Sequence, residues 1–168
     1  MAENQFEEFD AKMDVLFTIN KDGVLENTEF DDTAGLNIDP DFEEIVDYIH
    51  KTAVVIPSGV TRIGDKAFYD KRWLTGVTIP DSTVSIGDSA FSDCYYMENI
   101  VIPENVAIIG NKAFVYCEAL AGVTIMNETV VIANDAFLGC GENLTIYAKS
   151  GSSAEKYAAE NSLRFEAI

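Results

Sequence analysis

Four phenylalanines recur at a constant interval of 23 residues along this chain, at Phe68, Phe91, Phe114 and Phe137. With a few departures the same frame surrounds them: an apolar-x-Ile-Pro run comes first, followed by Ile-Gly, Ala-Phe and Cys. A fixed period of about 20 to 50 residues is typical of stacked supersecondary units, each of which buries its apolar face against its neighbours. The repeat therefore predicts a solenoid with one continuous core.

The first segment of each copy alternates between the two faces of a strand. Val77 and Ile79 flank Thr78, and a side-chain period of two places the outer pair on one face and Thr78 on the other. We predict a short strand in every copy, ended by a proline that cannot donate a ladder hydrogen bond. These segments are residues 54–57, 77–80, 100–103 and 123–126, although the last has methionine in place of proline.

Two other repeated positions carry structural expectations. Phenylalanine rings from neighbouring coils, about 4.8 Å apart like neighbouring strands, should stack into an aromatic spine that dominates stability. The recurrent glycines at Gly64, Gly87 and Gly110 mark either a positive φ or a place without room for a Cβ atom.

The whole repeat reads apolar-x-Ile-Pro-x-x-Val-x-x-Ile-Gly-x-x-Ala-Phe-x-x-Cys-x-x-Leu, and it resembles the repeat of the BspA-like leucine-rich repeat family over residues 54–143. The resemblance implies a right-handed solenoid of the leucine-rich-repeat type, with a short parallel strand in each repeat. It also implies protein adhesion and recognition, commonly on microbial cell surfaces, and no enzymatic activity. The first copy departs from the frame at Lys71, where cysteine is expected, and the last copy departs at Met126 and Ala133.

We expect a single domain over residues 1–168, since 48% apolar content supports one core and no linker rich in Pro, Gly or Ser divides the chain. It comprises an acidic N-terminal cap (1–53), four repeats of which the last is shortened (54–143) and a C-terminal cap (144–168).

Local signals predict the elements of both caps. Ser152 and Glu155 form a capping box, which predicts a helix over about 153–161, followed by a short final strand. At the other end, Asp39-Pro40 supplies a helix start. Helically spaced apolar residues follow it at Phe42, Ile45, Val46 and Ile49.

The charge is concentrated in the N-terminal cap. The net charge is −18, and 15 of the 29 acidic residues lie in residues 1–53, against three lysines. Such a surface repels nucleic acid and attracts basic partners. We interpret it as a solvated cap that keeps the chain soluble and monomeric; the alternative is an acidic mimic or a docking domain for a basic partner.

The sequence and the family resemblance indicate different locations. No stretch of the sequence predicts membrane insertion, and the N-terminus lacks the basic and then apolar pattern of a signal peptide. The sequence by itself favours the cytoplasm, whereas the family resemblance implies a secreted or cell-surface protein.

Residues 18–29 permit two interpretations. Read as a degenerate EF-hand loop, they place Gly23 at the sixth position and oxygen ligands at Asn20, Asp22, Glu26 and Glu29, although Thr18 replaces the first aspartate and no second loop follows. This reading predicts a calcium-responsive structural domain. Read as a β-hairpin, Lys21-Asp22-Gly23 forms the turn between two apolar strands, as an entry cap.

The three cysteines occupy one column of the repeat, at Cys94, Cys117 and Cys140. Three ligands in a row cannot surround a tetrahedral zinc ion, and parallel side-chain vectors oppose disulfides. We expect buried thiols. The only histidine, His50, has no partners for nucleophilic or acid–base chemistry, so the sequence predicts neither an enzyme nor a cofactor other than the possible calcium ion.

Two surfaces are candidates for binding a protein partner of unknown identity. The first is an aromatic rim, in which the 23-residue register places Arg72 beside Tyr95 and Trp73 beside Tyr96, with Tyr116 in the next coil. Trp, Tyr and Arg dominate binding hot spots. The alternative is that Trp73 and Tyr96 fold down over the coil edge and fill gaps there. The second surface is the strand face, a flat ladder of Val55, Thr78, Val101, Thr124 and Thr145.

Overall fold

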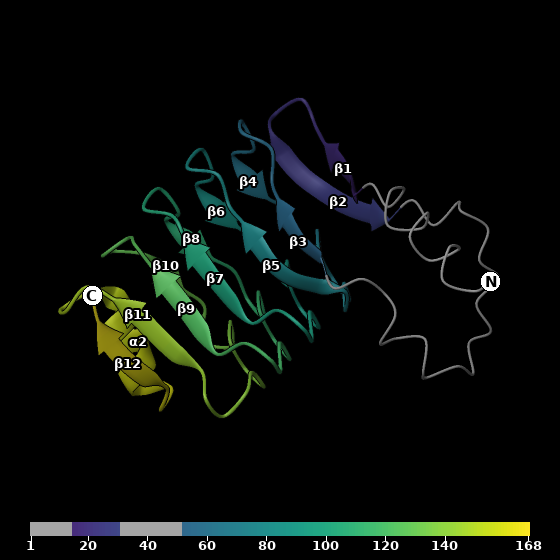
Figure 1. The fold of residues 1–168 in the computed structure, drawn as a ribbon. Helices are drawn as coiled ribbons and strands as arrows, with labels where there is room; N and C mark the ends of the chain where they lie inside the picture. The colour runs from purple at the N-terminus through teal and green to yellow at the C-terminus, as the bar shows by residue number, and fades with distance from the viewer. Residues whose placement is uncertain (1–14, 31–51) are drawn as a thin grey trace, which may run out of the picture.

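The computed structural model describes residues 15–30 and 52–168, and within them the coils stack side by side along one axis (Figure 1). The predicted helix at residues 40–49 lies outside the described residues. Two sheets run along the stack. Figure 1 shows the hairpin of β1 (Val15–Ile19) and β2 (Val24–Phe30) at one end and the helix α2 (Ser153–Glu160) at the other.

The long-strand sheet contains one strand from each coil, in the order β12-β11-β9-β7-β5-β3. These strands are β3 (Thr52–Val55), β5 (Leu74–Thr78), β7 (Asn99–Ile102), β9 (Gly122–Ile125), β11 (Thr145–Ala148) and β12 (Arg164–Ala167). The four predicted strands and the final strand are confirmed. Gly122 pairs with Thr145, which is again a step of 23 residues, so the expected shortening of the last repeat is wrong.

The short-strand sheet was not predicted as such, and its order is β1-β2-β4-β6-β8-β10. Its members are β1 (Val15–Ile19), β2 (Val24–Phe30), β4 (Arg62–Ile63), β6 (Ser85–Ile86), β8 (Ile108–Ile109) and β10 (Val131–Ile132). The isoleucine that precedes each glycine of the frame is the second residue of a two-residue strand. Two residues are too few to show alternation, so sequence periodicity does not detect such strands.

The phenylalanine column forms the predicted spine. The rings of Phe68, Phe91, Phe114 and Phe137 follow one another at centroid distances of 4.9, 5.2 and 4.9 Å, with interplanar angles of at most 14°. Tyr157 from α2 closes the stack edge-on, 6.0 Å from Phe137. All four phenylalanines are buried, so the spine runs through the core from the first coil to the helix.

The repeated glycines are required for close approach between coils. A Cβ atom on Gly110 would lie 2.5 Å from Asp88 Oδ1 and 2.8 Å from the Asp88 backbone nitrogen. None of these frame glycines has a positive φ, so the first of the two expected reasons is wrong and the second is confirmed. Positive φ values occur instead at other positions of the turns, including Lys66, Ser89 and Lys112.

Polar side chains tie each coil to the next. Asp65 Oδ1 accepts a hydrogen bond from the Asp88 backbone N–H at 3.0 Å, and Asp88 Oδ1 accepts one from the Asn111 backbone N–H at 2.8 Å. These carboxylates lie at the turn positions of successive coils. Each therefore satisfies a backbone donor that the short strands leave unpaired.

The cysteine column is a second internal ladder. The thiols of Cys94, Cys117 and Cys140 donate to backbone carbonyl oxygens of the preceding coil, at 3.2, 3.1 and 3.1 Å. All three are free, as predicted; two are buried and Cys140 is half-buried. Desolvation raises the pKa of Cys94 and that of Cys140 to about 12, and it also raises the pKa of Cys117.

The hairpin interpretation of residues 18–29 is confirmed, and the helix–loop–helix of an EF-hand is absent from this segment. Strands β1 and β2 pair antiparallel, and β2 then pairs in parallel with β4 through Val24–Arg62 and Leu25–Ile63. The buried hydroxyl of Thr28 donates to the Ala67 carbonyl oxygen at 2.9 Å. The hairpin thus contributes the first two strands of the short-strand sheet.

The C-terminal helix begins where the capping box predicts. Ser152 is the N-cap, and its hydroxyl accepts from the Glu155 backbone N–H at 3.3 Å. The Glu155 carboxylate accepts from the Gly151 N–H, one residue earlier than in the standard capping box. Tyr157 in this helix donates its hydroxyl to the Asn134 carbonyl oxygen, which fastens the helix to the last coil of the repeat.

Candidate functional site

The strand face is the outward side of the long-strand sheet. One column of aligned residues crosses it: Val55, Thr78, Val101, Thr124 and Tyr147. The expectation for Thr145 is wrong, because the register pairs it with Gly122 and its side chain is buried; Tyr147 takes the place in the column. Val55 and Val101 are 69% and 55% exposed, so apolar surface is open to a partner on this face.

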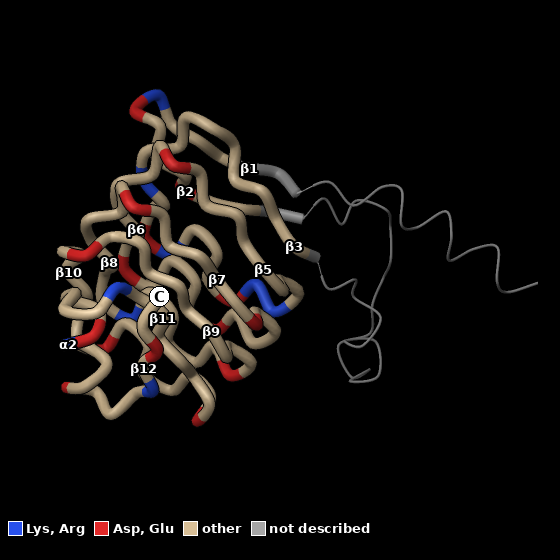
Figure 2. The backbone as a smooth tube through the Cα atoms, turned by 60° about the vertical axis from the view of Figure 1, so that its left-hand side comes forward, with Lys and Arg blue, Asp and Glu red and all other residues tan. Residues whose placement is uncertain are grey.

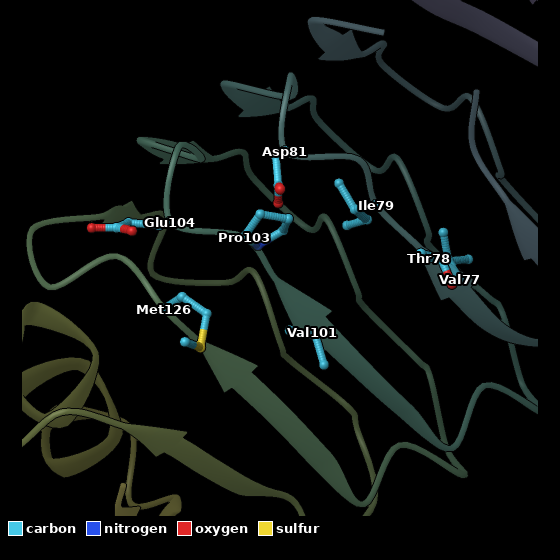
Figure 3. Close-up of a pocket in the computed structure, with 8 residues that line it drawn as sticks. All are labelled: Val77, Thr78, Ile79, Asp81, Val101, Pro103, Glu104 and Met126. Carbon is cyan, nitrogen blue, oxygen red and sulfur yellow. The ribbon is translucent and has the colours of Figure 1, made fainter. Parts of the chain in front are cut away.

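A hollow of about 440 Å³ opens at the ends of β5, β7 and β9 (Figure 3). Figure 3 shows that three successive coils contribute to its lining. The lining residues are Val77, Thr78, Ile79, Asp81, Val101, Pro103, Glu104 and Met126. Met126 stands where earlier copies have proline and is 49% exposed. The hollow therefore combines an apolar floor with two carboxylates, which suits an apolar segment that carries positive charge.

The aromatic rim is partly as predicted. The Arg72 guanidinium carbon lies 5.0 Å from the centroid of the Tyr95 ring, which confirms the expected neighbours. Arg72 Nε also donates to Asp70 Oδ1 at 2.9 Å, and this hydrogen bond and the charge of Asp70 raise the pKa of Arg72. Arg72 is thus held in place and stays charged.

The remaining rim residues differ in exposure. Trp73 is half-buried and packs against the core, as the gap-filling alternative predicts. Tyr95 and Tyr96 are also half-buried, whereas Tyr116 is 51% exposed, and its ring lies over Gly139. Tyr116 is therefore the most accessible aromatic side chain of the predicted rim, and the binding role of the rim stays a prediction.

The predicted calcium ligands lie in and beside the hairpin turn. Asn20 Oδ1 accepts from the backbone N–H groups of Asp22 and Val24, at 2.9 and 3.1 Å. Asn20 Nδ2 donates to Glu26 Oε1 at 2.8 Å, and Glu29 lies in β2. Among the described residues, no three side chains of His, Cys, Asp or Glu gather in a way that could hold a metal ion. Calcium binding stays a prediction.

Two surfaces were not identified from the sequence. Ile108 and Val131 are more than half exposed on the short-strand sheet. A second hollow crosses the phenylalanine-containing turns beside Lys66 and Tyr69. The signal that could have found it is the pair of serines in the middle coil, Ser89 and Ser92, where the flanking coils have longer side chains. No helix within residues 15–30 and 52–168 is long and apolar enough to cross a membrane.

Comparison with known proteins gives the class and then the family. The chain is a leucine-rich-repeat solenoid. The family model described as the BspA type leucine rich repeat region matches residues 44–165 in six copies, two more than the frame identified from the sequence. The chain therefore belongs to the BspA-type leucine-rich repeat family. None of the curated proteins matches it.

Three solved structures show how far this likeness extends. A leucine-rich repeat protein from Bacteroides capillosus is 28% identical, with 83% of this chain and 99% of that chain covered and a TM-score of 0.59. A leucine rich cell surface protein from Faecalibacterium prausnitzii is 26% identical, and the match covers 65% of this chain and 35% of that chain with a TM-score of 0.51. The match thus spans about a third of that protein's length. A leucine rich repeat protein from T. pallidum shares the fold. It is 21% identical, and the match covers 82% of this chain and 69% of that chain with a TM-score of 0.51.

Proposed function

We propose that this chain is a non-enzymatic protein-binding module and that the strand face is its principal binding surface. The observation that carries the proposal is the pair of exposed valines, Val55 and Val101, beside a hollow with an apolar floor. Exposed apolar surface of this kind marks interaction sites in soluble domains. The coils hold the surface rigid, so docking orders few side chains and loses little entropy.

Charge indicates the chemistry of the partner. Asp and Glu outnumber Lys and Arg along the described coils (Figure 2), and Asp81 and Glu104 border the hollow. Complementary charges accelerate encounter and select partners. The preferred partner presents an apolar side chain flanked by lysine or arginine. The 15 acidic residues within residues 1–53 add to the same attraction.

We place this binding at a cell surface, in an adhesion or scaffolding role. The support is the structural likeness to the F. prausnitzii cell surface protein over about two thirds of this chain. The chain acts as a monomer in this proposal, and the aromatic rim around Arg72 and Tyr95 supplies a second contact.

The test is affinity capture from cell-surface extracts, followed by titration of each captured protein. Val101→Glu introduces a charge into the strand face, and Val131→Glu makes the same change at a similarly exposed valine of the short-strand sheet. We expect the strand-face variant to weaken binding by about 2 kcal/mol or more and the control to leave it unchanged. Circular dichroism establishes that both variants fold.

Three results would contradict the proposal. Equal binding by the wild type and the Val101→Glu variant would remove the strand face from the site. If Arg72→Ala alone abolished binding, the site would move to the rim. A wild-type chain that retained no protein from any extract would argue against a binding module altogether.

A further inference from the structure

A second hollow, of about 360 Å³, crosses the turns that carry the spine phenylalanines. Lys66, Ser89 and Lys112 occupy the same position in three successive coils, and Tyr69 and Ser92 occupy the next lining position. The backbone φ values at Lys66, Ser89 and Lys112 are 61°, 54° and 55°, so the three side chains leave the backbone in the same way. The hollow opens over the middle coil, where Ser89 lies between two lysines, and its base includes the buried Ser92 and Val115.

The charge of this hollow is opposite to that of the chain. The chain carries a net charge of −18, yet the hollow is lined by two lysines and a single carboxylate, Asp93. That carboxylate already accepts a hydrogen bond from the Ser92 hydroxyl. Neither lysine forms an ion pair with a described residue; the Lys66 ammonium lies 6.0 Å from the centroid of the Tyr69 ring. Two unpaired cations around a hollow favour an anionic ligand.

The walls of the hollow are apolar. Tyr69, Tyr116 and Leu138 contribute to the lining and are 48%, 51% and 57% exposed. Tyrosine at such positions offers a flat ring with a polar tip, which contacts apolar ligand groups at low entropic cost. The hollow therefore suits a ligand that has anionic groups on one side and apolar groups on the other.

The coil spacing selects the conformation of that ligand. Two coil steps, of 4.9 and 5.2 Å along the spine, put the backbones of Lys66 and Lys112 about 10 Å apart. In a polyproline II helix, residues i and i+3 share a face and are about 9 Å apart. In an extended strand, residues on one face are separated by about 7 or 13 Å. Carboxylates three residues apart in a polyproline II segment match the lysines best.

We propose that this hollow binds an acidic, proline-containing peptide segment in the polyproline II conformation. Acidic residues three apart pair with Lys66 and Lys112, and the prolines between them lie over Ser92 and against Tyr69 and Tyr116. Aromatic-lined grooves bind such segments because the ligand is already ordered. The proposal rests on the protein-binding function above and names the chemistry of a ligand at a separate surface.

The test uses fluorescence anisotropy with two labelled synthetic peptides of equal composition. The first is Pro-Glu-Pro-Pro-Glu-Pro, with its acids three apart, and the second is Pro-Glu-Pro-Glu-Pro-Pro, with its acids two apart. The double variant Lys66→Gln/Lys112→Gln removes both cations of the hollow. The matched control, Lys149→Gln/Lys156→Gln, removes two exposed lysines that pair with Glu128 and Glu160.

We expect the first peptide to bind more tightly than the second and the hollow variant to weaken its binding about tenfold, while the control changes it little. Equal binding of both peptides, or no binding of either, would overturn the proposal. Binding of polygalacturonate with the same lysine dependence, in the absence of peptide binding, would assign the hollow to an acidic glycan instead. In each of these outcomes, the proposed function of the strand face would still hold if the Val101→Glu variant captured less of its protein partner than the wild type did.

Discussion

At the scale of single residues, the thiol column shows how a small side chain is fitted between coils. The Cys94 thiol is buried and donates to the Phe68 carbonyl oxygen, and Cys117 repeats the contact one coil further along. The thiol is a weak donor, and its contact lies in a position where neither water nor an ion reaches it. Burial therefore keeps each thiol protonated at neutral pH.

This protonation makes stability depend on pH in the alkaline range. The pKa of Cys94 is about 12 in the folded chain, whereas an unfolded thiol titrates near its ordinary value of about 8.5. Above pH 8.5 the unfolded chain binds fewer protons, so the free energy of unfolding falls as pH rises. Between pH 8 and pH 10 the free energy of unfolding falls in both proteins. We expect the fall to be about 1–2 kcal/mol smaller in the Cys94→Ala variant than in the wild type.

Urea unfolding under reducing conditions at the two pH values measures this difference. Cys117, Cys140 and Tyr157 also have pKa values raised by burial, but all three are common to both proteins, so the comparison isolates the contribution of Cys94. Equal losses in the wild type and the variant would show that the thiol titrates in the folded state as it does in the unfolded chain.

At the scale of elements, the glycine that follows β4, β6 and β8 sets how closely two coils approach. Gly110 lies against the Asp88 backbone, whereas Gly76, within β5, has only the Ala53 Cβ atom near its own Cβ position, at 3.8 Å. The same Gly→Ala substitution can therefore be compared at a crowded position, Gly110, and at an uncrowded one, Gly76.

We expect Gly110→Ala to lower the free energy of unfolding by about 1–3 kcal/mol, because the added methyl group meets backbone atoms that cannot move aside. Gly76→Ala should be neutral or stabilise by up to about 1 kcal/mol, since alanine restricts the unfolded chain. Chemical denaturation of both variants provides the measurement. A Gly110→Ala variant as stable as Gly76→Ala would show that the coils separate without cost.

The elements also show what could be predicted from the sequence. The long strands and the stacked phenylalanines were predictable from the sequence. The phenylalanines recur with a constant period, and the strands show alternation, and both patterns can be read directly from the order of residue types. The exposure of Trp73 and the existence of the Lys66 hollow were not, because both depend on the lengths of side chains in neighbouring coils. Thr145 was misassigned because a column is set by the 23-residue register, in which Tyr147 follows Thr124.

At the scale of the whole molecule, each coil contacts mainly its two neighbours, as in other repeat proteins. Deletion of residues 88–110 removes one full period and joins Gly87 to Asn111, which reproduces the Gly110–Asn111 junction. We expect this variant to fold cooperatively with lower stability and a smaller denaturant m value, because less surface is exposed on unfolding. Circular dichroism and urea titration would measure both.

Deletion of residues 88–109 is the matched control, since it is one residue short of a period. A shift of one residue exchanges the two faces of every following strand, so the core residues would point outward. We expect this control not to fold. If both deletions behaved alike, the register would not be what specifies the fold.

The serines that line the Lys66 hollow lie in the same turn as a phenylalanine of the spine. Ser89 and Ser92 line the hollow, whereas Phe91 between them belongs to the spine, so the proposed binding and the packing of the core depend on separate positions of one turn. Ser89 is half-buried at the mouth of the hollow, so a larger residue there would narrow the hollow without touching the spine. A substitution at Ser89 would therefore change the ligand that we propose for the hollow, while Phe91 keeps the coils stacked.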